Sequence, residues 1–105
     1  MMMNSKAFPK GTNLEETLEF YFQLCSLEIS SKNMAVVAAT LANGGVCPLT
    51  GVRIFKEETV NHVISIMHSC GMYDYSGEWG YSVGIPAKSG VGGCVYLVVP
   101  KVMGI

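Results

Sequence analysis

Charge is scarce in this sequence. Only 14% of its 105 residues are Asp, Glu, Lys or Arg, whereas 50% are hydrophobic, and the formal net charge is −1. A nearly neutral chain without a basic cluster lacks the electrostatic footprint of a nucleic-acid-binding protein. So few charged residues leave much of the surface of an isolated fold without polar cover. We therefore expect the chain to be a piece of something larger, and the alternatives are an obligate oligomer and a membrane protein.

Long apolar runs are absent as well. Glu, Lys, His, Gly or Pro interrupts every candidate before it reaches the roughly 20 residues that a transmembrane helix needs, which argues against a membrane protein. The first residues, Met1 to Lys6, resemble neither a signal peptide nor an Arg-rich transit peptide, so this sequence contains no targeting segment.

Metal-ligand spacing is also missing. No two cysteines form a C-x-x-C pair, and His62 and His68 fall on different faces of a predicted helix, so we expect no metal site. The cysteines lie in apolar patterns, where a thiol behaves as a small hydrophobe. We therefore expect reduced, buried cysteines in an intracellular protein. They are Cys25, Cys47, Cys70 and Cys94.

The hydrophobic pattern predicts an α+β chain of three helices followed by a β-hairpin. Apolar residues recur at helical spacing over 14–25, 31–42 and 56–70. The first of these helices carries two apolar stripes, so we expect it to be buried on more than one side. Residues 79–85 alternate as a half-buried strand does, and residues 94–99 are apolar almost throughout, as in a buried strand.

Helix ends are marked by residues that satisfy free backbone groups. Thr12 and Glu15 form a capping box before the first helix. Ser30 or Ser31 can cap the second helix, and Asn43-Gly44-Gly45 ends it as a left-handed C-cap does.

The glycine-rich segment between the two predicted strands, residues 84–93, surrounds Lys88 and Ser89. Backbone N–H groups of such a loop can stabilise negative charge on a carbonyl oxygen, although a hairpin connection with a solvated lysine is the commoner explanation. Lys88-Ser89-Gly90 fits the third element of the S-x-x-K, S-D-N, K-[ST]-G set of penicillin-recognising hydrolases. No serine of this sequence has lysine three residues later, so the Ser-Lys nucleophile is absent from it.

Four segments in order carry a resemblance to the serine-dependent glutaminases, especially the kidney- and liver-type enzymes of eukaryotes. They are LEFYFQLCS at 18–26, ATLANGG at 39–45, MHSCGMYD at 67–74 and PAKSGV at 86–91. The resemblance implies a β-lactamase/transpeptidase-like fold, of which this chain is a part. It also implies hydrolysis of L-glutamine to L-glutamate and ammonia through a serine acyl-enzyme, without metal or organic cofactor.

The resemblance also assigns residues to roles. Tyr21 matches a tyrosine that contacts bound glutamine. Tyr73 matches the tyrosine beside the nucleophilic serine, which relays protons and contacts substrate. Val91 matches the residue whose backbone N–H helps to form the oxyanion hole, and Lys88 and Ser89 line the same wall of the site.

By this resemblance, residues 8–105 are the C-terminal portion of a glutaminase catalytic domain, and residues 1–7 stay unassigned. The nucleophile then precedes Met1, and the isolated chain is expected to be inactive. The intact enzyme is implied to be a homo-oligomer, a tetramer, and to be mitochondrial like the eukaryotic enzymes, or otherwise cytoplasmic. Two alternatives stay open: a β-lactamase or transpeptidase of the same fold, or a non-catalytic fragment that associates with glutaminase subunits.

Overall fold

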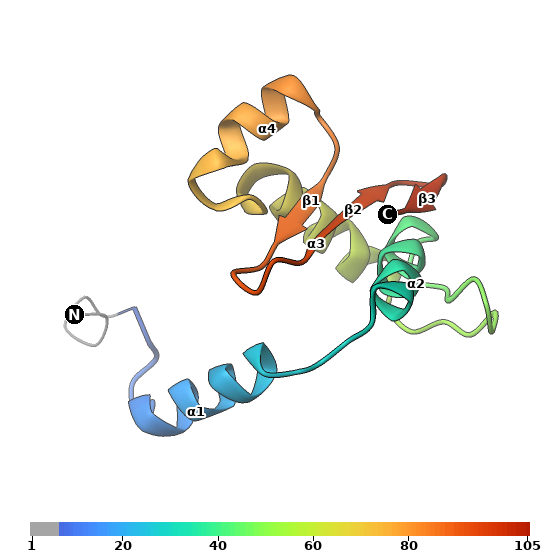
Figure 1. Ribbon diagram of the computed structural model, residues 1–105. Helices are drawn as coiled ribbons and strands as arrows, with labels where there is room; N and C mark the ends of the chain where they lie inside the picture. Colours follow the sequence, from blue (N-terminus) through green and yellow to red (C-terminus); the bar gives the residue numbers. More distant parts are fainter. Residues whose placement is uncertain (1–6) are drawn as a thin grey trace.

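The computed structural model describes residues 7–105. Figure 1 shows one helix, α1 (Leu14–Cys25), lying apart from the remaining elements, which gather around a small sheet. Helices α2 (Ser31–Ala42) and α3 (Glu57–Cys70) pack with the central strand around one core. The α+β class is therefore confirmed. The core residues are Ala38, Leu41, Ala42, Val60, Met67 and Val98.

The sheet has three antiparallel strands in the order β1 (Ala87–Ser89), β2 (Val95–Val99) and β3 (Met103–Gly104). Gly104 lies so close to the backbone of Ala38 and the next residue of α2 that any Cβ would overlap it, so only glycine lets β3 approach this helix. The β1–β2 register pairs Ala87 with Leu97, Lys88 with Tyr96, and Ser89 with Val95.

The predicted order of three helices followed by a hairpin is wrong in two places. Residues 79–85 are not a strand, because α4 (Ser76–Ser82) follows a short 3-10 helix, η1 (Tyr73–Tyr75). The Trp79 indole N–H donates to the Ile85 carbonyl at 2.7 Å, and Tyr81, which the alternation placed on a buried face, is 92% exposed. The alternation arose from small residues, Gly80, Ser82 and Gly84, between larger apolar ones rather than from a pleated strand.

The hairpin itself is shifted along the chain. Lys88 and Ser89, predicted in the connecting loop, belong to β1, and residues 90–94 make the connection to β2. Strand β3, which was not predicted, adds a third member to the sheet. Within β2 only Val98 is buried and the other residues are half-buried or exposed, so this strand is less enclosed than its apolar sequence indicates.

Helix α1 forms where its pattern predicts it, but the prediction that it is buried on more than one side is wrong. None of its residues is buried within the part of the chain that the structure describes. Its N-cap is Asn13, whose side chain accepts the N–H groups of Glu15 and Glu16 at 3.0 and 3.4 Å. The Thr12 hydroxyl instead donates to the Pro9 carbonyl, so the predicted capping box is replaced by an asparagine cap.

The end of α2 is closed as predicted. Gly44 adopts a φ of 64°, its N–H donates to the Leu41 carbonyl, and the Gly45 N–H donates to the Thr40 carbonyl at 2.8 Å. These two hydrogen bonds make a Schellman motif. The Lys101 N–H, from the turn between β2 and β3, donates to the Ala42 carbonyl, so a distant segment completes this helix end.

The four cysteines are free thiols, but the expectation that all are buried is wrong, because only Cys47 is buried within residues 7–105. Cys25 lies on the unpacked helix α1, and Cys70 and Cys94 are exposed at the end of α3 and in the hairpin connection. No helix in residues 7–105 combines the length and the apolar character needed to cross a membrane.

Candidate functional site

The junction between α3 and β1 fixes the backbone on which the candidate site is built. At Gly71, which follows α3, a Cβ would overlap the carbonyl groups of Ala87 and Met67, so only glycine allows this approach. The Ser89 N–H donates to the Gly71 carbonyl at 3.1 Å. The end of α3 and the strand that carries Lys88 are therefore held directly against each other.

Tyr73 follows this junction and has a backbone conformation that bulky residues rarely adopt. Its φ is 53°, in the left-handed region, and its side chain is 59% exposed. The buried Ser76 hydroxyl donates to the Tyr73 carbonyl at 2.6 Å and accepts the Met72 N–H at 3.0 Å. The turn is thus closed by one side chain that bonds on both sides of the strained residue.

Lys88 reaches the same tyrosine from β1. Its Nζ lies 4.5 Å from the centroid of the Tyr73 ring, a distance at which a cation is attracted to an aromatic face. The same ammonium donates to the Ser89 carbonyl, and the Lys88 side chain is half-buried. Two of the residues predicted for the site, on separate elements, are therefore in contact.

Val91 lies in the connection between β1 and β2. A hydrogen bond from the Gly90 N–H to the Cys94 carbonyl, at 2.8 Å, and another from the Gly93 N–H to the Gly90 carbonyl close this connection. The Val91 side chain is 94% exposed, and no acceptor within residues 7–105 takes its N–H. The backbone donor that the oxyanion role requires is thus unused in this part of the chain.

Tyr21 lies on α1 and is 58% exposed, with its ring centroid 5.9 Å from that of Phe22. A hydrogen bond with the Cys25 thiol, one helical turn away, raises the pKa of the Tyr21 phenol, and the charge of that thiol, burial and the Tyr73 phenol add to the shift. No hydrogen bond or cation–π contact of the described residues joins Tyr21 or Val91 to the Tyr73–Lys88 pair.

The whole chain, residues 1–105, matches the family model described as Glutaminase. This chain belongs to the glutaminase family. The "Glutaminase liver isoform, mitochondrial" of Rattus norvegicus is 52% identical over 104 residues, which are 99% of this chain and 17% of the rat protein. A "Glutaminase" of Microcystis aeruginosa is 56% identical over 92 residues, which are 88% of this chain and 27% of the bacterial protein. The chain thus spans less than a third of each of these glutaminases.

Solved glutaminase structures share the fold. One is the covalent complex between the Bacillus subtilis glutaminase YbgJ and 5-oxo-L-norleucine, with a TM-score of 0.85 and 31% identity over 94% of this chain and 33% of that chain. A probable glutaminase, ybaS, is 49% identical with a TM-score of 0.65 over 68% of this chain and 23% of that chain. The arrangement of helices and strands described above therefore recurs within larger glutaminase structures.

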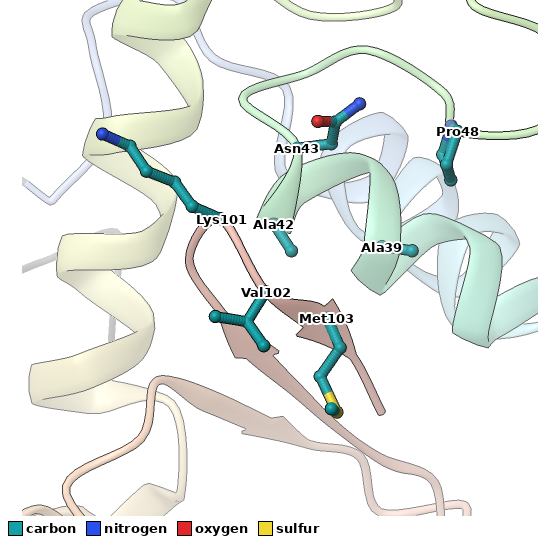
Figure 2. A pocket seen from close by; sticks show the side chains of 7 residues that line it. All are labelled: Ala39, Ala42, Asn43, Pro48, Lys101, Val102 and Met103. Carbon is teal, nitrogen blue, oxygen red and sulfur yellow. The ribbon is translucent and has the colours of Figure 1, made fainter.

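Two pockets in the part of this glutaminase segment that the structure describes lie away from these residues. The pocket drawn in Figure 2 has a volume of about 190 Å³ and lies between α2 and the β2–β3 turn, at the sheet edge opposite β1. A second pocket, of about 300 Å³, adjoins it beside Arg53 and Glu57. Neither contains a residue predicted for the site. The first is lined by Ala39, Ala42, Asn43, Pro48, Lys101, Val102 and Met103.

A metal site would need several ligand side chains close together. Within residues 7–105, no three His, Cys, Asp or Glu side chains gather as metal ligands would.

Sequence reasoning missed Ser76, although a serine at the start of a helix commonly bonds to nearby backbone groups. The mistaken strand over 79–85 hid that signal, because it removed the helix that Ser76 begins.

Proposed function

We propose that this chain carries part of the active site of a glutaminase, which hydrolyses L-glutamine to L-glutamate and ammonia on a β-lactamase/transpeptidase-like fold. The observation that carries the proposal is the contact between Lys88 and the constrained Tyr73 in a chain of the glutaminase family. The Ser-x-x-Lys pair, absent from this sequence, comes in this proposal from the rest of the catalytic domain.

The proposed reaction proceeds through a serine ester of glutamate. The serine oxygen attacks the side-chain amide carbon of glutamine, and the carbonyl oxygen becomes an oxyanion. Ammonia leaves as the tetrahedral intermediate collapses, and water then attacks the ester and releases glutamate. Each half of the reaction moves a proton, so a group that accepts and returns protons beside the serine is required.

The residues of this chain take the following parts. Tyr73 relays protons beside the serine and contacts substrate, and its phenol can both donate and accept a hydrogen bond. The unused Val91 N–H donates to the oxyanion, a contribution typically worth ~10²–10³ in kcat. Tyr21 contacts bound glutamine, and Lys88 and Ser89 form a wall of the site.

A chimaera tests the proposal. Residues 1–105 replace the matched segment of the Rattus norvegicus liver isoform, and glutamate and ammonia release from L-glutamine are measured. We expect hydrolysis by the chimaera and none by the 105-residue chain alone. Tyr73→Phe removes the phenolic proton and should lower kcat by about 10²- to 10⁴-fold. Tyr75→Phe, two residues along in η1, is the matched control and should keep full activity.

A soluble, folded chimaera that does not hydrolyse glutamine would overturn the proposal. Turnover of a chromogenic cephalosporin instead would favour the β-lactamase alternative, and binding of the chain to intact glutaminase without turnover would favour a non-catalytic role. Size-exclusion chromatography of the chimaera tests the expected tetramer. The compartment stays a prediction, since the relatives include a protein named mitochondrial and a bacterial one.

A further inference from the structure

The conformation of Tyr73 has to be maintained by its surroundings. A left-handed φ of 53° is unfavourable for an aromatic residue, and such positions persist only where neighbouring groups determine them more than once. Half of the Tyr73 side chain is exposed, so packing against a core does not hold the ring. The groups that fix it must therefore be individual contacts, and within residues 7–105 two side chains, Ser76 and Lys88, add to the backbone hydrogen bonds of the turn.

The first contact acts on the backbone. The Ser76 hydroxyl accepts the Met72 N–H and donates to the Tyr73 carbonyl, so it bridges the backbone from the N–H of the preceding residue to the carbonyl of Tyr73 itself. Ser76 is buried, with only 8% of its surface exposed. The Tyr73 carbonyl also accepts the Ser76 backbone N–H, so removing the hydroxyl would leave the Met72 N–H as the group without its partner, which loosens the hold on the turn.

The second contact acts on the ring. Lys88 Nζ lies 4.5 Å from the ring centroid, and the position of Lys88 is set by β1, which pairs with β2 and bonds to Gly71 through the Ser89 N–H. The backbone of Tyr73 is thus held from α4 and its ring from the sheet. These are separate elements, so each restrains a different degree of freedom of the tyrosine.

We propose that Ser76 and Lys88 are positioning residues for Tyr73. Ser76 fixes the left-handed backbone, and the Lys88 ammonium fixes the direction of the ring, so that the phenol is placed before substrate arrives. This inference rests on the proposed function, because it assigns these residues to the tyrosine that relays protons. A misplacement of about 1 Å in such a group can lower the rate by about 10²-fold.

The geometry can be tested on the 105-residue chain without any activity. Hydrogen exchange should show the Met72 amide protected, and Ser76→Ala should remove that protection, whereas Ser82→Ala in the same helix should not. The ε-methylene protons of Lys88 should show an upfield NMR ring-current shift that Tyr73→Leu abolishes. An unprotected Met72 amide together with unshifted Lys88 protons would overturn the proposal.

The consequence for catalysis is tested in the active chimaera. Ser76→Ala and Lys88→Met should each lower kcat by about 10- to 100-fold while KM changes about twofold or less. Lys88→Arg keeps a cation that stacks on aromatic rings and should recover most of the loss. The control Lys32→Met removes an exposed lysine of α2 and should have no effect.

The outcomes separate this inference from the function on which it rests. If the chimaera is inactive, the proposed function fails, and the exchange and NMR measurements still decide the geometry. If it is active and Tyr73→Phe inactivates it, but Ser76→Ala and Lys88→Met keep full kcat, the positioning roles are overturned and the function stands. If Ser76→Ala does not fold, the comparison of Lys88→Met with Lys88→Arg decides, and equal loss in both variants would overturn the role of the charge.

Discussion

Helix α1 and the unit formed by residues 31–105 both carry many large apolar side chains, but they bury them differently. Within the described chain none of the α1 residues is buried, whereas α2, α3 and β2 enclose a common core. Phe20 and Phe22 of α1 are 62% and 59% exposed. An amphipathic pattern therefore identifies a face that can be buried, and burial itself depends on a partner surface.

The difference has a local cause in the residues of α2. Small side chains such as Ala38 and Ala42 let this helix approach β3 at Gly104, so backbone meets backbone and the apolar faces close. Helix α1 has no such neighbour in residues 7–105, and an isolated helix of its length is marginal in water. We therefore expect the two regions to respond independently to substitution.

The largest effect is expected at the contact between α2 and β3. Gly104→Ala places a Cβ inside the backbone of α2, and backbone atoms cannot move aside as a flexible side chain can. The cooperative urea transition of residues 31–105 should be lost, as measured by near-UV circular dichroism. Gly77→Ala, where a Cβ meets nothing within 4 Å, is the control and should leave the transition in place.

A large effect is also expected in the core between α3 and the sheet. Met67 is 4% exposed, and Met67→Ala should lower the free energy of unfolding by about 2–5 kcal/mol through lost burial and the cavity left behind. Its neighbour Ile66 is 63% exposed, and Ile66→Ala should change this energy by less than about 0.5 kcal/mol. Similar losses in the two variants would show that the core is not where the structure places it.

A smaller effect is expected at the start of α1. Asn13→Ala removes the side chain that accepts two backbone N–H groups, which should cost that helix about 1 kcal/mol. Amide exchange in α1 should accelerate while exchange in α2 and α3 stays unchanged. Faster exchange in all three helices would contradict the independence of the two regions.

The smallest effect is expected on the exposed apolar face of α1. In the isolated chain, Phe20→Ser should change the free energy of unfolding by less than about 0.5 kcal/mol, because the ring contacts little in residues 7–105. The same substitution in the chimaera described above measures whether this face of α1 is covered in a complete catalytic domain. A larger loss of stability there would mean that other glutaminase residues cover this face, and an equally small loss would mean that it stays exposed.

The parts of the fold that could be predicted are those specified by local chemistry. The three longer helices follow from apolar periodicity and from caps at Ser30 and Gly44, and the structure confirms them. Strand β3 has two residues, too few for any periodicity. Helix α4 was mistaken for a strand because Gly80 and Ser82, placed beside large aromatic residues, imitate the alternation of a pleat.

The candidate site likewise contains residues that the sequence could predict and one that it could not. Tyr73 and Lys88 were found through segments that resemble the glutaminases, and their contact is now seen in the structure. Ser76 was not found, because its part depends on the left-handed φ of Tyr73 and on the hydrogen bonds across that turn. A sequence states which side chains are available, but a strained backbone angle results from tertiary contacts that no single residue type specifies.

The closing of α2 by Lys101 and Gly104 has a consequence for the order of events during synthesis. The residues of α2 leave the ribosome long before the β2–β3 turn, which supplies the N–H for the Ala42 carbonyl, and before β3, which supplies the glycine that packs on Ala38. Contacts between segments so distant in sequence form slowly, because a long loop must close first. The nascent chain therefore exposes the apolar face of α2 until residues 95–105 emerge, and transiently exposed apolar surface of this kind favours aggregation of partly folded chains.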